Sequence, residues 1–175
     1  MAGLGKTYVI AFAGLKPGQH EFEFEADNKF FAFFNDPEIS RGSIQVNVSL
    51  FRQATMMVLN FRLKGIFDIT CDRCATGAQM ALAGEHQLVV KLSEPDGSED
   101  DEVIALPLTE SEIDLAPFIL EYIKLSLPAR KVPCEVSGDL SLCDQEVIEK
   151  LNLLKSTASE GSDDRMSRLK NIKWS

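Results

Sequence analysis

The sequence has few of the side chains from which enzyme active sites are usually built. Its 175 residues include only two histidines, His20 and His86, and neither has a neighbour in the sequence that would make it a catalytic base. The chain also lacks a glycine-rich phosphate loop, a His-Glu-x-x-His motif and a Gly-x-Ser-x-Gly motif. We therefore predict a protein that is not an enzyme.

Long apolar segments are also missing. No apolar run approaches the roughly 18 residues that a spanning helix requires, so we expect no membrane association. The first residues do not resemble a signal peptide, and the cytoplasm is the expected location. Thiols stay reduced in that compartment. We therefore expect the four cysteines to be free, metal-bound or redox-active rather than joined in disulfides.

Positive charge is scarce. The chain has 18 lysines and arginines against 27 aspartates and glutamates, which gives a net charge of −9. Sequence-independent binding to nucleic acid depends largely on neutralising phosphates, and this balance argues against it. An acidic chain is better matched to basic partners, such as ribosomal proteins.

Alternating apolar residues predict several strands. We expect strands at 8–12 and 20–25 paired as a hairpin, a strand from Gly42 to Leu50 paired with a long one at 55–71, and a further pair at 88–92 and 103–106. The acidic segment 94–102 is expected to be a solvated hairpin loop rather than a contact for a basic partner or a divalent ion.

Helices are predicted at 29–34, with Asp27 as the N-cap, from Asp114 to Leu127, with Asp114 as the N-cap, and after Asp144. Strands followed by segregated helices indicate an α+β fold, with a largely antiparallel sheet or partly closed barrel packed against two or three helices. We expect one domain over 1–155, with 156–175 forming a flexible linker and a short tail or docking helix.

Cysteines form the one group of residues that suggests chemistry. Cys71 ends the long strand in phase with its buried face, and Cys74 follows after two residues, the usual spacing in half of a zinc knuckle. Cys134 and Cys143 would supply the other half, although eight residues separate them and no glycine adjoins these cysteines. Three interpretations stay open: buried structural thiols, a zinc site formed by all four cysteines, and a thiol redox site.

The order of several short motifs resembles the YceD-like family, also called the large ribosomal RNA subunit accumulation protein family. The motifs are Gly14 to Phe22, Ile69 to Cys74, Ile113 to Leu115 with Glu121, Leu125 to Pro128, Cys143, and Asp164-Arg165 with Leu169. The resemblance implies a cytoplasmic, non-enzymatic accessory role in ribosome biogenesis, supporting the synthesis, processing or stability of large-subunit ribosomal RNA. Its implied partners are that RNA or large-subunit ribosomal proteins.

Basic side chains are the candidates for any direct contact with RNA or another partner. They lie on the polar face of the long predicted strand and around the predicted helix that starts at Asp114: Arg62, Lys64, Lys124, Arg130 and Lys131. The alternative is that they are ordinary solvated charges, which the acidic composition favours.

Overall fold

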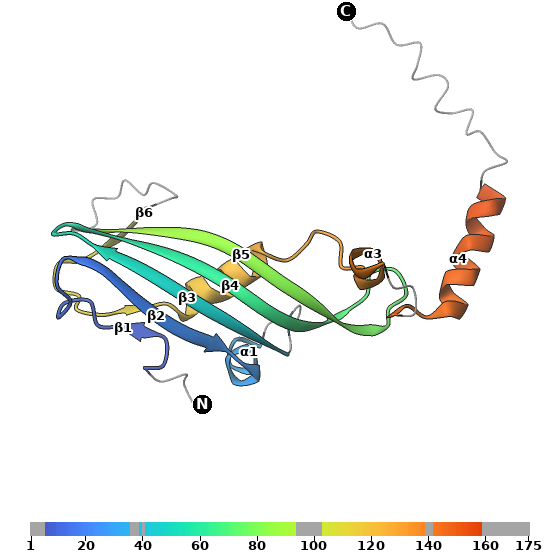
Figure 1. Ribbon diagram of the computed structural model, residues 1–175, viewed down its shortest axis with the longest axis horizontal. Coiled ribbons are helices and arrows are strands. Elements are labelled where there is room, and N and C mark those ends of the chain that lie inside the picture. Colours follow the sequence, from blue (N-terminus) through green and yellow to red (C-terminus); the bar gives the residue numbers. More distant parts are fainter. Residues whose placement is uncertain (1–5, 36–38, 40, 94–102, 139–141, 159–175) are drawn as a thin grey trace, which may run out of the picture.

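A computed structural model describes residues 6–35, 39, 41–93, 103–138 and 142–158. Its main feature is a five-stranded sheet with strand order β2-β3-β4-β5-β6 (Figure 1). The strands are β2 (Gly18–Ala26), β3 (Gly42–Arg52), β4 (Met56–Thr70), β5 (Gly77–Leu92) and β6 (Val103–Leu106). Because β2 to β5 are antiparallel and the sheet is open, the α+β class with a largely antiparallel sheet is confirmed, and the barrel alternative does not apply.

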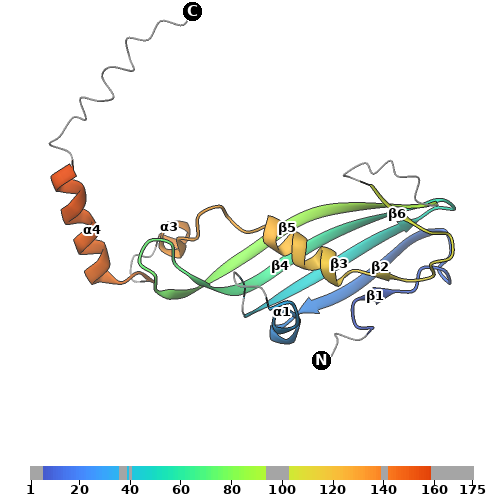
Figure 2. The same ribbon diagram turned by 180° about the vertical axis from the view of Figure 1, so that it is seen from behind.

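The period-two sequence gives the sheet one buried and one exposed face. In β4, Leu59, Phe61 and Leu63 are buried, whereas Asn60 and Arg62 between them are exposed. Helix α2 (Ala116–Leu125) lies across the buried face (Figure 2), where the Tyr122 ring packs with its centroid 4.9 Å from that of Phe61. The exposed face carries the polar half of each strand.

Helix α1 (Asn28–Phe34) closes one end of this core and confirms the predicted helix and its cap. The Asp27 carboxylate accepts hydrogen bonds from the backbone N–H groups of Lys29 and Phe30, both at 3.0 Å. Phe30 and Phe31 are buried, and their rings meet edge to face with centroids 5.5 Å apart. The helix is therefore held by burial of its aromatic residues as well as by its cap.

One predicted strand pairing is wrong, and another has the predicted partners but the opposite direction. The predicted hairpin of 8–12 with 20–25 does not form, because β1 (Val9–Ile10) pairs with β7 (Ile113–Asp114) instead of β2. Tyr8, which precedes β1, contacts β2 through its ring, whose centroid lies 6.0 Å from that of Phe24, and not through strand pairing. The predicted pair at 88–92 and 103–106 exists, but β6 is parallel to β5, so the two strands are not a hairpin. The acidic segment 94–102 lies outside the described residues.

Two elements begin elsewhere than predicted, and one helix was not predicted. β5 begins at Gly77, eleven residues before the predicted strand at 88–92. Asp114 is the last residue of β7 and Leu115 occupies the N-cap position of α2, although the Asp114 carboxylate accepts a 2.9 Å hydrogen bond from the N–H of Ala116. A short helix that was not predicted, α3 (Pro133–Ser137), lies in the segment 129–142 that was expected to be irregular.

The last described helix is α4 (Gln145–Ala158), which Figures 1 and 2 show projecting away from the sheet beyond the far end of the β4–β5 hairpin. Its start is capped as predicted, since the Asp144 carboxylate accepts hydrogen bonds from the N–H groups of Glu146 and Val147. α4 continues past residue 155, and the predicted linker and tail from residue 159 onward lie outside the described residues. No described helix is long and apolar enough to cross a membrane.

Gly84 lets the end of α2 approach the sheet closely. A Cβ at this position would lie 2.9 Å from Ser126 Cβ and closer still to Ser126 Oγ. We expect Gly84→Ala to lower the free energy of unfolding by about 1–3 kcal/mol, as overpacking does. Urea denaturation of Gly84→Ala, Ser126→Gly and the double variant would measure this, and the double variant should regain part of the loss. A loss in the double variant equal to the sum of the two single losses would contradict the proposed clash.

Candidate metal centre

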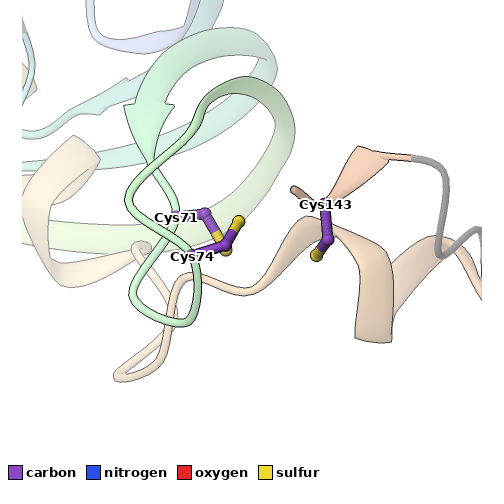
Figure 3. Close-up of side chains that lie close together, drawn as sticks. All are labelled: Cys71, Cys74 and Cys143. Carbon is purple, nitrogen blue, oxygen red and sulfur yellow. The ribbon is translucent and has the colours of Figure 1, made fainter. Parts of the chain in front are cut away.

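Three cysteines that are distant in the sequence meet at the far end of the β4–β5 hairpin. Cys71 follows β4 and Cys74 lies in the turn before β5, whereas Cys143 directly precedes the cap of α4. Figure 3 shows Cys71 and Cys74 on one loop, with Cys143 on the separate C-terminal segment. All three are buried, and their Sγ atoms lie within 4.8 Å of one another. This group could hold a metal ion.

The turn itself is shaped to present its two thiols. The N–H of Cys71 donates to the carbonyl of Thr76 and the N–H of Ala75 donates to the carbonyl of Cys71, both at 2.9 Å. The N–H of Arg73 points at Cys71 Sγ, at 3.5 Å. Ala75 has φ 58°, a left-handed conformation in which glycine is the usual residue. The turn therefore brings a backbone N–H to a sulfur although no glycine adjoins these cysteines.

This strained alanine gives a specific prediction. A non-glycine residue in the left-handed region destabilises the folded chain by about 1–2 kcal/mol. Glycine removes this strain, but it also gives the unfolded chain more entropy, which offsets part of the gain. We expect Ala75→Gly to raise the free energy of unfolding by about 0.5–1 kcal/mol. Chemical denaturation measures the change, and a loss of stability in Ala75→Gly would contradict the conformation assigned to this turn.

Hydrogen bonds set the protonation of the thiols in opposite directions. The Thr76 hydroxyl, with the backbone N–H groups of Asp144 and Thr76, lowers the pKa of Cys74 to about 6. The neighbouring Cys134 thiol, burial and the Cys74 thiol raise the pKa of Cys143 to about 12. The lowered pKa of Cys74 favours its thiolate at neutral pH, whereas the raised pKa of Cys143 favours its protonated form, as expected for sulfurs packed against one another.

Cys134 belongs to the same buried cluster. It lies in α3, is 1% exposed, and its thiol interacts with that of Cys143. A compact group separate from the main core contains all four cysteines and two aliphatic residues: Cys71, Cys74, Val132, Cys134, Cys143 and Ile148. All four cysteines are free thiols, and the sulfurs that lie within 4.8 Å of one another are those of Cys71, Cys74 and Cys143, while Cys134 lies in the same buried cluster outside that group.

The cluster also meets the chain that enters it from α2. The N–H of Asp72 donates to the carbonyl of Lys131 at 2.9 Å, and the N–H of Lys131 donates to the Asp72 carboxylate at 2.7 Å. An ion pair joins Arg73 to Glu135 in α3 at 3.9 Å. Asp72 and Arg73, the two residues between the paired cysteines, therefore bind the segment that carries Cys134.

A redox role fits this geometry less well than metal binding. A reactive thiol is commonly activated at a helix N-terminus and is partly exposed. Cys74 is 8% exposed, and the element that follows it is the strand β5, which begins at Gly77. Its lowered pKa comes from local hydrogen-bond donors, which also suit a metal-binding thiolate.

The predicted basic contact residues do not form one surface. Arg62 and Lys64 lie on the exposed face of β4, where Arg62 pairs with Glu85 at 2.9 Å. Lys124 is on α2, which covers the opposite face of the sheet. Arg130 pairs with Glu135 at 3.3 Å beside the cysteines, and Lys131 follows it in the chain. Contact of these five residues with a partner stays a prediction.

The exposed face of the sheet carries a hollow that the sequence analysis missed. It has a volume of about 610 Å³, and its lining is mainly amide and carboxylate side chains: Gln19, Glu21, Asn47, Asn60, Glu85 and Gln87. Arg62 and His86 are the basic residues in the lining, and the Arg62 side chain is already paired with Glu85. The alternation within each strand predicted that these side chains are exposed. It did not predict that they are neighbours, because that depends on the register between strands.

His86 has a structural position. Its ring stacks on Tyr122 with centroids 4.7 Å apart, and its Nε2 lies 2.7 Å from Ser126 Oγ. The Ser126 hydroxyl donates to the Tyr122 carbonyl at 2.7 Å, so Nε2 is the donor in its bond to Ser126. His86 is therefore not placed to take a proton from Ser126, and the pair is not an activated nucleophile.

Comparison with known proteins gives one match. The family model described as "Large ribosomal RNA subunit accumulation protein YceD" matches residues 59–173. That range covers β4 to α4, including all four cysteines. No curated protein and no solved structure matches the chain.

Proposed function

The chain belongs to the YceD family, and from this premise we propose that it is a non-enzymatic cytoplasmic accessory factor in ribosome biogenesis. In this role it supports the synthesis, processing or stability of large-subunit ribosomal RNA. The observation that carries the proposal is the family match, which spans about two thirds of the chain and links it to accumulation of that RNA.

The distribution of charge favours a protein over RNA as the direct partner. The net charge is −9, and the exposed side chains of edge strand β2 include Glu21, Glu23 and Glu25. A surface of this sign repels phosphates, whereas it attracts the basic proteins of the large subunit. We therefore propose a basic large-subunit ribosomal protein as the first contact, with ribosomal RNA as the alternative.

Deletion of the gene tests the role. We expect the ratio of large- to small-subunit ribosomal RNA to fall, and a plasmid copy of the gene to restore it. An unchanged ratio and a normal ribosome profile would contradict the proposal. Capture of the tagged chain from growing cells, with and without ribonuclease, then separates the two partners, because a protein contact survives the nuclease and an RNA contact does not.

A second function, metal binding, is favoured by the buried thiols. We propose zinc as the ion for Cys71, Cys74 and Cys143, because thiolates are soft ligands and a cluster without carboxylate or imidazole suits zinc better than magnesium or calcium. Sulfurs around a tetrahedral zinc ion lie about 3.8 Å apart at Zn–S distances of about 2.3 Å. The three Sγ atoms are within 4.8 Å, so they reach this geometry with side-chain movements of about 1 Å or less.

Cobalt(II) tests this site independently of the ribosomal role. Reduced chain titrated with cobalt should develop the visible absorption of a tetrahedral thiolate complex, saturating at about one equivalent, and zinc should displace it. A spectrum that stays that of the hydrated ion would count against the site.

A further inference from the structure

We propose that the open edge of β2 binds an extended segment of a basic protein by strand addition, so that the segment becomes a further strand of the main sheet. In the matching segment, lysine or arginine alternates with apolar residues. The inference rests on the basic protein partner proposed above, and it adds the binding surface and the mode of binding.

The strand β2 has a neighbour in the sheet on one side only. It comes first in the order β2-β3-β4-β5-β6 and lies along one edge of the sheet (Figure 1), while β1 belongs to a separate two-stranded sheet with β7. Proteins commonly block an edge with a short strand, a proline or a bulge. β2 is nine residues long, contains no proline and keeps one unbroken register with β3. Its outer edge therefore has the length and regularity that strand addition requires.

The register of the sheet shows which backbone groups face this edge. At the β3–β4 turn, the N–H of Gln53 donates to the carbonyl of Met56 at 2.9 Å, and the register of the two strands continues from this pair. Bonded pairs recur at every second residue, so the odd-numbered residues of β3 bond to β4 and the even-numbered ones bond to β2. Val48 is one of the latter, and its partner is Phe22. The odd-numbered residues of β2 therefore turn their N–H and C=O groups to the open edge.

These outward backbone groups are those of Gln19, Glu21, Glu23 and Glu25. The Tyr8 hydroxyl donates to the carbonyl of Glu25 at 2.6 Å from outside the main sheet, in agreement with this phase. Within the described part of the chain, the first three residues take no part in the backbone–backbone hydrogen bonds made outside the strand pairs. Their N–H and C=O groups can therefore bond to an added strand.

The side chains of the outward residues determine the charge of the partner. Glu21, Glu23 and Glu25 are exposed on one face of β2. A residue directly opposite on an added strand places its side chain on the same face, where lysine or arginine attracts the glutamate and a carboxylate repels it. A second copy of β2 would set glutamate against glutamate in every register that matches the faces. The charge therefore favours a basic strand over pairing between two copies of this chain.

The opposite face of β2 determines the apolar half of the pattern. Phe22 and Phe24 pack against the main core but are only partly buried. Val46 and Val48, their partners in β3, are fully buried because β2 and β4 flank them on both sides. Apolar side chains on an added strand would cover the two phenylalanine rings in the same way, and the burial of this apolar area would stabilise the complex.

Two hollows beside β2 have room for long basic side chains. One has a volume of about 500 Å³ and is lined by three residues of β2 and two of β3: Glu23, Phe24, Glu25, Gln45 and Asn47. The hollow of about 610 Å³ described above reaches β2 at Gln19 and Glu21. Carboxylate and amide oxygens accept hydrogen bonds from ammonium and guanidinium groups. Lysine or arginine side chains of an added strand would therefore find acceptors on both β2 and β3.

Amide hydrogen exchange of the full chain tests the open edge and its occupation. In the free chain, the amides of Gln19, Glu21 and Glu23 should exchange at least about tenfold faster than those of Phe22 and Phe24. The probe is a synthetic peptide of about eight residues in which lysine alternates with valine. At saturation it should slow the three outward amides at least about tenfold and change the other two less than about twofold. Outward amides that keep their exchange rates, or a Kd above about 1 mM, would contradict the proposal.

Two substitutions at Glu23 separate charge from strand pairing. Glu23→Gln removes only the charge and should weaken peptide binding about two- to fivefold. Glu23→Pro also removes an outward N–H that β3 does not use, so the sheet should keep its amide protection. This variant should bind the peptide about fivefold more weakly than Glu23→Gln, or weaker still. Equal binding by the two variants would count against strand addition.

Glu85→Gln is the matched control for the charge. Glu85 lies on β5 in the same cross-strand row as Glu23, three strands away, and its loss changes the net charge equally. At about 0.15 M salt the Debye length of about 8 Å is shorter than three strand spacings of about 4.8 Å each, so this variant should bind the peptide like wild type. An equal loss in Glu85→Gln and Glu23→Gln would mean that the peptide binds the whole face and not the edge.

A methylated peptide tests the hydrogen bonds without any change in the protein. The same sequence with a methyl group on every backbone nitrogen keeps its charge but cannot donate to a strand. It should bind at least about tenfold more weakly than the unmodified peptide. Equal affinity would mean that the peptide binds through its charge alone, and the proposed strand addition would be wrong.

Complementation of the gene deletion separates this inference from the proposed function. Plasmid copies of the wild-type and Glu85→Gln chains should restore the ratio of large- to small-subunit ribosomal RNA, whereas a Glu23→Pro copy should not. If Glu23→Pro restores the ratio fully, the edge is not the contact and the proposed function stands. If deletion leaves the ratio unchanged, the proposed function is wrong, and the peptide experiments alone decide whether the edge accepts a basic strand.

Discussion

Gly65→Ala is expected to lower the free energy of unfolding by about 3 kcal/mol or more, a large part of the 5–15 kcal/mol typical of a domain. Gly65 lies in the middle of β4, paired with Ile44 in β3 and Leu82 in β5. A Cβ at this position would lie 2.6 Å from Ile44 Cα and closer still to the carbonyl oxygen of Ser43. Both contacts are with the backbone of β3, which cannot move aside as a side chain can, so the strand pair itself must shift.

Gly77→Ala is the matched control for this prediction. Gly77 is also a strand glycine, at the start of β5, but a Cβ there would meet no atom within 4 Å. We expect no loss, and a gain of up to about 0.5–1 kcal/mol from the reduced entropy of the unfolded chain. Urea denaturation of the two variants measures the difference. A Gly65→Ala variant within about 0.5 kcal/mol of wild type would contradict the close approach of β3 and β4.

Cys143→Ser is expected to remove most of the stabilisation that zinc provides. Loss of a residue that only hydrogen-bonds to a metal ligand typically weakens metal binding by roughly 10- to 100-fold. Loss of a thiolate ligand itself should weaken zinc binding by more than this. At a free zinc concentration of about 100 times the wild-type Kd, zinc stabilises the wild-type chain by about 2.7 kcal/mol, whereas a variant weakened 100-fold gains only about 0.4 kcal/mol. Competition with a chromogenic chelator gives the affinity, and denaturation with and without zinc gives the stabilisation.

Thr76→Val provides a graded comparison for Cys143→Ser. The Thr76 hydroxyl donates a hydrogen bond to Cys74 and is the largest single cause of the lowered Cys74 pKa. Thr76 is not itself one of the proposed zinc ligands. Its loss should weaken zinc binding by about 10- to 100-fold, which is less than the loss of Cys143. The order wild type, Thr76→Val, Cys143→Ser is therefore expected. Equal zinc affinity in all three would show that these residues do not form the site.

The elements that were predicted well are those whose signals are local. Asp27 before an apolar run predicted α1 and its cap, and the alternation around Phe61 predicted β4. The first half of β5 was missed because its inward side chains include Ala78 and Gly84, which have little strand propensity, although they alternate correctly. The parallel pairing of β6 and the pairing of β1 with β7 were missed because they depend on contacts between distant segments, which periodicity does not report.

The sequence singled out the cysteines as a possible metal site, but it did not predict how three of them meet. The sequence identifies four cysteines, yet the usual spacing rule argued against Cys134 and Cys143 as a pair, because it describes two ligands on one tight turn. Here Cys71 and Cys74 lie on one turn, and Cys143 reaches them from the position just before the cap of α4. The absence of glycine was misleading for a similar reason, since Ala75 takes the left-handed conformation itself.

The described residues form two buried parts. The sheet with α1 and α2 has its own core, and the four cysteines lie in a smaller cluster at the end of the β4–β5 hairpin. The family match covers both parts from β4 onward, and it includes every cysteine.

The zinc content of the native chain is the deciding quantity. Elemental analysis of protein purified without chelator should give about one zinc per chain, with the four thiols resistant to alkylation until the chain is denatured. Less than about one tenth of an equivalent of zinc, even after reduction and incubation with zinc, together with four thiols that react freely in the folded chain, would contradict the account.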